Sequence, residues 1–234
     1  MAKQLLLDAL QGKRTETTPW MVYAGTHMGY LIGETVDNYF QDADLLVKGV
    51  TQCADRYKAD GVPLCADLQI EAMALGCGYK WGKTDTPQII SHPCENMQPK
   101  EAGLKIPTSA DGRFQVVVEA GKKMKPILDD MDVALIGFIA GPCTLAEHLI
   151  GGTKFYKSFY KDRDRMEEIF QFVSEVILAS TRIYMNEIGC DIIAWVDPTA
   201  TQLSEKDFRA FVSPALQSSI AEVHAAGKTS SFWL

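Results

Sequence analysis

Short apolar runs alternate along the chain with longer segments in which apolar residues recur every three or four positions. The apolar runs cover residues 20–24, 62–66, 133–140 and 191–196. The longest helical pattern covers 162–188. Continuous apolar runs are typical of strands covered on both faces, and strand–helix alternation predicts parallel βαβ units. The pattern therefore predicts an α/β fold around a parallel sheet.

Other segments give weaker signals. Apolar spacing predicts shorter helices over 5–10, 43–57 and 71–75. Residues 78–113 are rich in Pro, Gly and polar residues, which predicts an irregular excursion over the surface. Residues 114–124 fit either a helix or a strand, and Pro126 predicts a break after them. A further helix should begin at Ser204, with Asp207 three residues later, and bend at Pro214.

Composition favours one globular domain over residues 1–234. The chain has 234 residues, of which 47% are hydrophobic and 23% charged, enough to build a sizeable core. Its net charge of −7 argues against a nucleic-acid surface. The short basic group at Lys122, Lys123 and Lys125 is interpreted as a solvated helix end.

Targeting signals and cysteine usage indicate a cytoplasmic protein. The apolar run at 5–7 is too short for a signal peptide, and no segment approaches the length that spans a bilayer. The six cysteines are scattered without a C-x-x-C pair, at positions Cys53, Cys65, Cys77, Cys94, Cys143 and Cys190. This spacing predicts reduced thiols rather than a disulfide framework.

Polar residues follow the predicted strands at the points where they end. Asp67 follows the second apolar run, residues 141–144 follow the third, and Asp197 follows the fourth. In parallel α/β folds the carboxyl edge of the strands carries the active site, so these positions are candidates for chemistry. Asp67 and Asp197 fit equally well as plain helix caps.

Four stretches, in order, resemble the uroporphyrinogen decarboxylase superfamily. "GFIAGPCTLAEHLIGG" (137–152) is similar to the strand-three segment, whose pattern is close to G-x-x-x-G-P-x-T-L-x-x-x-L-x-G-G. "TTPWMVYAGTHMGY" is similar to the first strand and its loop, and "DGVPLCADLQIEAMALGCGY" to the second. "GCDIIAWVDPTATQLSEKDFRAFVSPAL" is similar to the fourth strand and the helix after it. The resemblance covers nearly the whole chain.

The resemblance implies a (β/α)8 TIM barrel with its site at the C-terminal mouth. The predicted strands match the first four of that barrel, and a complete barrel has about 250 residues or more. Residues 228–230 lie where strand five would begin. We therefore expect a partial barrel, the truncated N-terminal half. Its exposed strand edges would favour self-association.

Two branches of the superfamily are relevant. Uroporphyrinogen decarboxylases act in porphyrin biosynthesis without a cofactor and hold a polycarboxylate substrate with an Arg-x-x-x-Arg pair on the first loop. Here that loop reads Val22 to His27, and other residues occupy both arginine positions. The resemblance places Asp67 at the aspartate that binds pyrrole N–H groups, and His148 where the decarboxylases have a tyrosine.

The corrinoid-dependent methyltransferases, of the methylcobalamin:coenzyme M type, are the better match. They lack the arginine pair and share Glu71-Ala72-x-x-x-Gly76 and the Asp197–Pro198 turn. Their zinc is held by a His-x-Cys on strand five and a later Cys, positions we expect beyond Leu234. His92-x-Cys94 has a similar spacing but is interpreted as an ordinary loop, and Cys143 as a packing residue.

These observations give one preferred hypothesis and two alternatives. The preferred function is methyl transfer from a corrinoid protein to a thiol or similar small-molecule acceptor. The full-length family member would use zinc and a corrinoid (methylcobalamin), and this chain is assigned no metal ligand. The alternatives are a tetrapyrrole decarboxylase and a non-catalytic half barrel, so enzymatic activity of this chain is left open. We predict Asp67 as catalytic; the predicted substrate-binding residues are Tyr23, His27, Glu71, His148 and Asp197.

Overall fold

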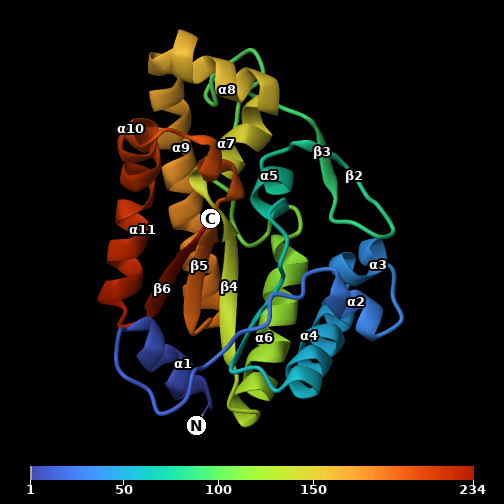
Figure 1. Ribbon diagram of the computed structural model, residues 1–234. Coiled ribbons are helices and arrows are strands. Elements are labelled where there is room, and N and C mark those ends of the chain that lie inside the picture. The colour runs from blue at the N-terminus through green and yellow to red at the C-terminus, as the bar shows by residue number, and fades with distance from the viewer. Residues whose placement is uncertain (1) are drawn as a thin grey trace.

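Four parallel strands form the sheet at the centre of the protein. The computed structural model describes residues 2–234. The sheet has the order β1-β4-β5-β6 and consists of β1 (Gly61–Pro63), β4 (Ala134–Ala140), β5 (Ile192–Val196) and β6 (Thr229–Trp233) (Figure 1). Every neighbouring pair is parallel, as the alternating pattern predicted. The register pairs Ile136 with Ile192 and Val196 with Trp233, so the strand ends meet at one edge.

Helices connect the strands and cover one side of the sheet (Figure 1). Before the first crossover lie α1 (Ala2–Leu10), α2 (His27–Leu31), α3 (Val36–Gln41) and α4 (Ala43–Tyr57). Between β1 and β4 come α5 (Ile70–Ala74) and α6 (Phe114–Asp130). Between β4 and β5 come α7 (Pro142–Ile150), α8 (Gly152–Lys161), α9 (Arg163–Arg182) and the π-helix η1 (Ile183–Ile188). Before β6 come η2 (Pro198–Gln202), α10 (Glu205–Asp207), η3 (Phe208–Val212) and α11 (Ser213–Ala225).

Two of the predicted strands differ from expectation at the edges of the sheet. The run at 20–24 is wrong as a full strand, because it pairs with β1 through a single bridge between Met21 and Gly61. Residues 229–233, expected to be only the start of a strand, form a complete strand paired with β5. If the bridge at Met21 is counted as the first position along the sheet, β6 occupies the fifth.

The region 78–130 holds two further corrections. The excursion contains an antiparallel hairpin, β2 (Gly78–Lys80) and β3 (Gln88–Ser91). Residues 114–124 are helical, and α6 continues through Pro126 to Asp130, so the predicted break is wrong. Buried residues on both sides of the proline, including Met124 and Leu128, hold the helix on the core, and this packing outweighs the local cost of proline.

The capping prediction is confirmed at α10. The Ser204 hydroxyl accepts a hydrogen bond from the backbone N–H of Asp207 at 3.1 Å. The segment that follows is a π-helix, η3, which leads directly into α11 with Pro214 in its first turn. Because Val212 and Ser213 both have right-handed helical backbone angles, Pro214 lies within a continuous helical segment, directly after the π-helical turn.

The two faces of the sheet are packed differently. On the helix-covered face, a large cluster joins β-strand residues such as Leu135 and Ile193 to the surrounding helices. On the opposite face, a smaller apolar cluster includes Phe138 and Ala194, and Leu6 of α1 packs against it. This second face, called the inner face below, is only partly covered within the described residues.

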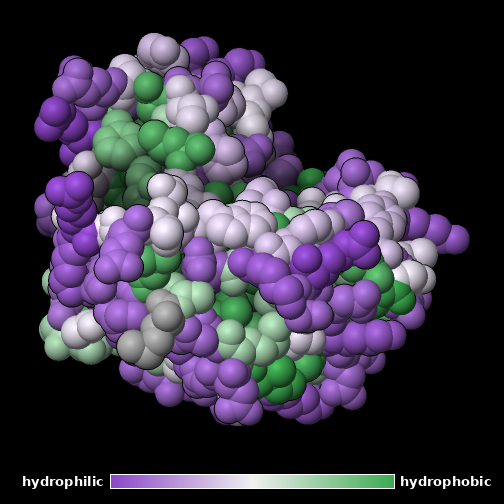
Figure 2. Space-filling model, turned by 60° about the horizontal axis from the view of Figure 1, so that its bottom comes forward, coloured by the Kyte–Doolittle hydropathy of each residue, from purple (hydrophilic) through white to green (hydrophobic). Residues whose placement is uncertain are grey.

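The sheet is open in the part of the chain that the structure describes. Its order begins at β1 and ends at β6, and no described strand joins these two. Figure 2 shows hydrophobic side chains gathered in a hollow at the upper left of its view, bordered by hydrophilic ones. Among residues 2–234, no helix combines the length and apolarity needed to cross a lipid bilayer.

Candidate active site

An ion pair between Asp67 and Arg113 lies just beyond the carboxyl end of β1. Asp67 is fully buried, and one of its oxygens contacts Arg113 Nη1 while the other accepts from the backbone N–H of Gln69 at 2.9 Å. Arg113 is the residue before α6 and also donates to the backbone carbonyl of Phe40, at 2.7 Å from Nη2. The Asp67 carboxylate and the Arg113 guanidinium therefore bond to each other and to backbone groups.

Aromatic and thiol groups complete the surroundings of Arg113. Its guanidinium lies 5.1 Å from the ring centre of Trp81 and 5.5 Å from that of Phe40. Burial alone would lower the pKa of Arg113, but Asp67 and then Cys65 outweigh it and raise the pKa. A buried pair of this kind keeps its charge because each partner replaces the water that the other has lost.

Glu71 lies on α5, near the Asp67–Arg113 pair and the end of β4. It is fully buried on α5, and neither carboxylate oxygen makes a hydrogen bond among the described residues. Burial raises the pKa of Glu71 to about 8, and the nearby N–H groups of Glu71 and Ala140 offset only part of that shift. A fully enclosed side chain cannot touch a substrate without movement, so its substrate-binding role stays a prediction.

Asp197 caps α7 rather than the helix that follows it in sequence. Its oxygens accept from the backbone N–H of Cys143 at 2.9 Å and from the N–H and hydroxyl of Thr144, each at 2.8 Å. Burial raises the pKa of Asp197, while these donors oppose the shift. The carboxylate links the end of β5 to the start of the Gly-Pro-Cys-Thr helix.

Three aromatic side chains form a surface on the inner face. Tyr23 stacks on Phe138 with ring centres 5.6 Å apart, and Trp233 meets both rings edge-on. Tyr23 is 61% exposed, whereas Phe138 is buried beneath it. Burial, and then the charge of Asp67, raise the pKa of Tyr23. The Tyr23 hydroxyl is therefore neutral, and the charge of Asp67 acts on it.

His148 lines a polar cavity at the same end of the strands. The cavity has a volume of about 510 Å³ and is bounded by α7, the β2–β3 hairpin and the loop after β1. Burial lowers the pKa of His148 to about 4; the charge of Asp67 opposes this shift, and the neighbouring His92 adds to it. Its Nδ1 makes no hydrogen bond among the described residues, so a neutral imidazole can accept one there.

His92 and Cys94 donate hydrogen bonds to carbonyls at the C-terminal end of α7. His92 Nδ1 donates to the carbonyl of His148 at 2.7 Å, and the N–H of Cys94 donates to the carbonyl of Leu149 at 2.9 Å. These contacts satisfy carbonyls that a helix end leaves free. Residues 92–94 form a loop after β3, and His92 Nδ1 is used in the contact with α7.

His27 is separated from these groups. Its Nε2 lies 2.7 Å from the Tyr57 hydroxyl on α4, in the layer of helices. The structure therefore brings Asp67, Tyr23 and His148 to one end of the sheet, together with buried Glu71 near Asp67 and Ala140. It places His27 in the helical layer.

The described residues do not fit a zinc ion. Strand β6, fifth in line along the sheet, reads Thr-Ser-Ser-Phe-Trp and holds no His or Cys. Across residues 2–234, no group of at least three His, Cys, Asp or Glu side chains could hold a metal. Burial raises the pKa of all six thiols, for example that of Cys94 to about 11, so they stay protonated.

Arg113 is the residue of this site that sequence reasoning missed. It lies at the end of the irregular excursion, 46 positions from Asp67 along the chain. No local pattern marks it, since one arginine before a helix is ordinary. Only the fold brings it to the end of β1.

Parallel strands, crossover helices and polar groups at the carboxyl edge define an α/β protein built on a parallel sheet. The chain matches the family model of uroporphyrinogen decarboxylase (URO-D) over residues 1–232, and it belongs to this family.

Relatives with two different names match at similar identity. Methylcobamide:CoM methyltransferase MtaA of Methanosarcina barkeri is 29% identical over 97% of this chain and 69% of its own length. Uroporphyrinogen decarboxylase of Wolbachia pipientis wMel is 30% identical over 76% of this chain and 52% of its own. Among solved structures, a methyltransferase from Methanosarcina mazei superimposes with a TM-score of 0.85 at 24% identity, over 99% of this chain and 68% of that one.

Proposed function

We propose that this chain belongs to the methyltransferase branch of the family. In this proposal the parallel sheet is the N-terminal part of a (β/α)8 barrel. The end of the sheet at Asp67 receives the methyl group of a methylated corrinoid, presented by a corrinoid protein. A thiol or similar small molecule accepts it.

The observation that carries this proposal is that Arg113 is already bonded to Asp67 and to the backbone, so it is not available to a substrate. A polycarboxylate tetrapyrrole requires guanidinium groups that are free to bind its carboxylates. Arg113 is the arginine beside Asp67, and its donors are already used by Asp67 and the Phe40 carbonyl. The first loop supplies no arginine either. A donor recognised through neutral and apolar contacts fits this end of the sheet better.

The aromatic surface and His148 would share the binding. The exposed face of Tyr23, with Trp233 beside it, offers a flat apolar area to a macrocycle. His148 lines the polar cavity and is neutral at pH 7 because of its low pKa. Its Nδ1 is buried and makes no hydrogen bond, so it would meet a donor on the acceptor molecule only when the ring turns toward the cavity. The same low pKa makes it a weak base, so its role is orientation.

The chemistry requires a nucleophilic acceptor. The acceptor sulfur forms a bond to the methyl carbon while the bond from that carbon to the donor breaks, and the electron pair stays with the donor. The thiol proton leaves to water or buffer. The described residues contribute binding and orientation; Asp67 acts by fixing Arg113 and the charge near Tyr23.

A methyl-transfer assay on the 234-residue chain tests the proposal. Methylcobalamin and a panel of small thiols are incubated with the chain, and the methylated thiol is quantified by mass spectrometry. We expect product above the protein-free rate, and a loss of it in Tyr23→Ala. The matched control is Tyr160→Ala, an exposed tyrosine on α8. Equal rates with and without protein contradict the proposed activity.

The decarboxylase remains the second candidate, because relatives with that name match at similar identity. Incubation with uroporphyrinogen and chromatographic analysis of the carboxylate content of the product separates the two. Products with fewer carboxylates would establish the decarboxylase. No turnover in either assay would favour the third alternative, a non-catalytic half barrel.

A further inference from the structure

The polar cavity beside His148 carries negative charge and no fixed positive charge. Its volume is about 510 Å³, and its walls include Gln69, Asp85, His92 and Glu147. Asp85 and Glu147 supply two carboxylates, and within residues 2–234 no Lys or Arg lines the cavity. A concave site with charges of one sign attracts ligands of the opposite sign.

Glu147 is the carboxylate of this cavity that lacks a cationic partner among the described residues. Its side chain is 29% exposed, and His148 Nε2 lies 3.9 Å from its Oε2. This contact is not an ion pair, because burial lowers the pKa of His148 to about 4 and leaves the ring neutral at pH 7. Burial also raises the pKa of Glu147, against the opposing charge of His92. A ligand with a positive charge would compensate the water that Glu147 has lost.

His92 adds a hydrogen-bond acceptor to the same walls. Its Nδ1 lies 2.7 Å from the carbonyl oxygen of His148, which can only accept, so Nδ1 carries the proton and Nε2 of the neutral ring is an acceptor. The turn from α7 to α8 leaves room for both lining groups. A Cβ at Gly151 would lie 2.9 Å from His92 Cδ2, and one at Gly152 would lie 3.0 Å from Glu147 Oε1.

The cavity lies at the same end of the sheet as the aromatic surface. Besides burial, the charge of Asp67 acts on the pKa of His148, which lines the cavity, and on that of Tyr23, which forms the surface. A small molecule held in the cavity by one end can therefore direct its other end toward the aromatic surface.

We propose that the methyl acceptor is a small thiol with a primary ammonium group, and that this cavity binds the ammonium. The ammonium donates hydrogen bonds to the Glu147 carboxylate and to His92 Nε2, and Asp85 adds negative charge at the rim. The nitrogen keeps its bonds and protons, so the methyl group is transferred to sulfur alone. Assigning the ammonium to the acceptor rests on the methyl transfer proposed above, whereas ammonium binding by the cavity does not.

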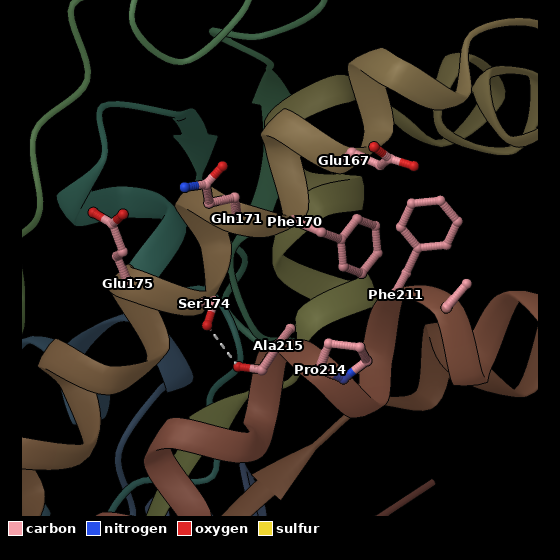
Figure 3. A pocket seen from close by; sticks show the side chains of 9 residues that line it. Glu167, Phe170, Gln171, Ser174, Glu175, Phe211, Pro214 and Ala215 are labelled. Atoms are coloured by element: carbon pink, nitrogen blue, oxygen red, sulfur yellow. Dashed lines mark hydrogen bonds between the residues drawn. The ribbon is translucent and has the colours of Figure 1, made fainter.

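A second cavity of the protein supplies a matched control residue. The groove between α9 and α11 has a volume of about 330 Å³, and its walls include Phe170, Phe211 and Pro214 (Figure 3). Glu175 also lines this groove and is exposed (Figure 3). Glu175 therefore matches Glu147 as a carboxylate beside a cavity, but no histidine acceptor lines the groove with it.

Saturation-transfer NMR titrations of the full chain, at about pH 7.5 where an alkyl ammonium stays charged, test the cavity. The probes are 2-aminoethanethiol, ethanolamine, 2-mercaptoethanol and 3-mercaptopropionate. We expect dissociation constants on the order of 1 mM for the two amines, and constants at least about tenfold higher for the neutral and the anionic thiol. Glu147→Gln should raise the constants of the amines about tenfold and Asp85→Asn about threefold, while Glu175→Gln should leave them unchanged.

Two outcomes would overturn the ammonium site. One is equal binding of all four probes, and the other is a preference for amines that survives Glu147→Gln. Circular dichroism of each variant shows that the fold is intact.

The methyl-transfer assay separates this inference from the proposed function. Glu147-dependent binding of 2-aminoethanethiol without any methylated product would refute the transfer and leave the ammonium site standing. Transfer to 2-mercaptoethanol as fast as to 2-aminoethanethiol would refute the acceptor assignment and leave the transfer standing. We expect 2-aminoethanethiol to be methylated faster, and Glu147→Gln to remove that advantage.

Discussion

At the scale of single residues, Arg113 sets the charge at the end of β1. It neutralises a carboxylate that is fully enclosed by protein, and it holds the carbonyl of Phe40 at the same time. Asp67 was predicted as a site residue because it follows a strand, and in the structure it does lie beyond the end of β1. Its role depends on its partner Arg113, which no local sequence pattern indicates.

Removing Arg113 should destabilise the fold strongly. Arg113→Ala leaves the Asp67 carboxylate buried without compensation, which costs about 3 to 5 kcal/mol of unfolding free energy. Arg182→Ala, which breaks the exposed pair with Glu222, should cost at most about 1 kcal/mol. Urea denaturation of both variants measures the difference. Equal losses would mean that the Asp67 pair is solvated.

Glu71 should make stability depend on pH. Its pKa rises from an ordinary value of 4.5 to about 8 in the folded protein, so the folded state binds more protons between these values. Its contribution to stability is therefore full below about pH 4.5 and is lost as the pH rises toward 8. Glu71→Gln should flatten the decline in melting temperature across this range, and Glu187→Gln, at an exposed site, should not. A decline of unchanged slope in Glu71→Gln would contradict the assignment.

At the scale of elements, helix α7 depends on a residue from another crossover. Asp197 reaches from the end of β5 to the first N–H groups of α7, and the negative charge also suits the helix N-terminus. Sequence reasoning considered Asp197 as a plain helix cap and did not identify the helix that it caps. The actual partner helix begins 55 residues earlier, at Pro142.

Asp197→Ala should therefore cost more than the loss of an exposed cap. It removes three hydrogen bonds to Cys143 and Thr144 in a buried position, and each unpaired buried donor costs about 1 to 3 kcal/mol. Asp162→Ala removes the N-cap bond of α9 at an exposed position and should cost about 0.5 to 2 kcal/mol. Thermal unfolding of both variants gives the comparison. A smaller loss for Asp197→Ala would exclude this capping role.

The elements that sequence reasoning found are those with strong local patterns. The runs at 133–140 and 191–196 became β4 and β5 because all their residues except Asp191 are apolar and both faces are covered or partly covered. The hairpin β2–β3 was missed because its residues are mostly exposed and carry no alternation. The run at 20–24 was overestimated, since only Met21 bridges to the sheet. Tertiary contacts determine whether these segments form strands.

At the scale of the whole molecule, the sheet offers an aromatic and uncharged inner face beside a polar cavity. Tyr23 and Trp233 come from opposite ends of the chain and meet over Phe138 because the parallel strands share one register. The open sheet leaves this surface accessible from the inner side. The proposed preference for a corrinoid over a polycarboxylate tetrapyrrole is a property of this combined surface.

Equilibrium dialysis of the 234-residue chain against methylcobalamin and, separately, uroporphyrin III tests that preference most directly. We predict that methylcobalamin binds at least about tenfold more tightly, and that Tyr23→Ala weakens its binding while Tyr160→Ala does not. Tighter binding of uroporphyrin, retained in Tyr23→Ala, would contradict the account. It would show that this end of the sheet recognises carboxylates despite the closed Asp67–Arg113 pair.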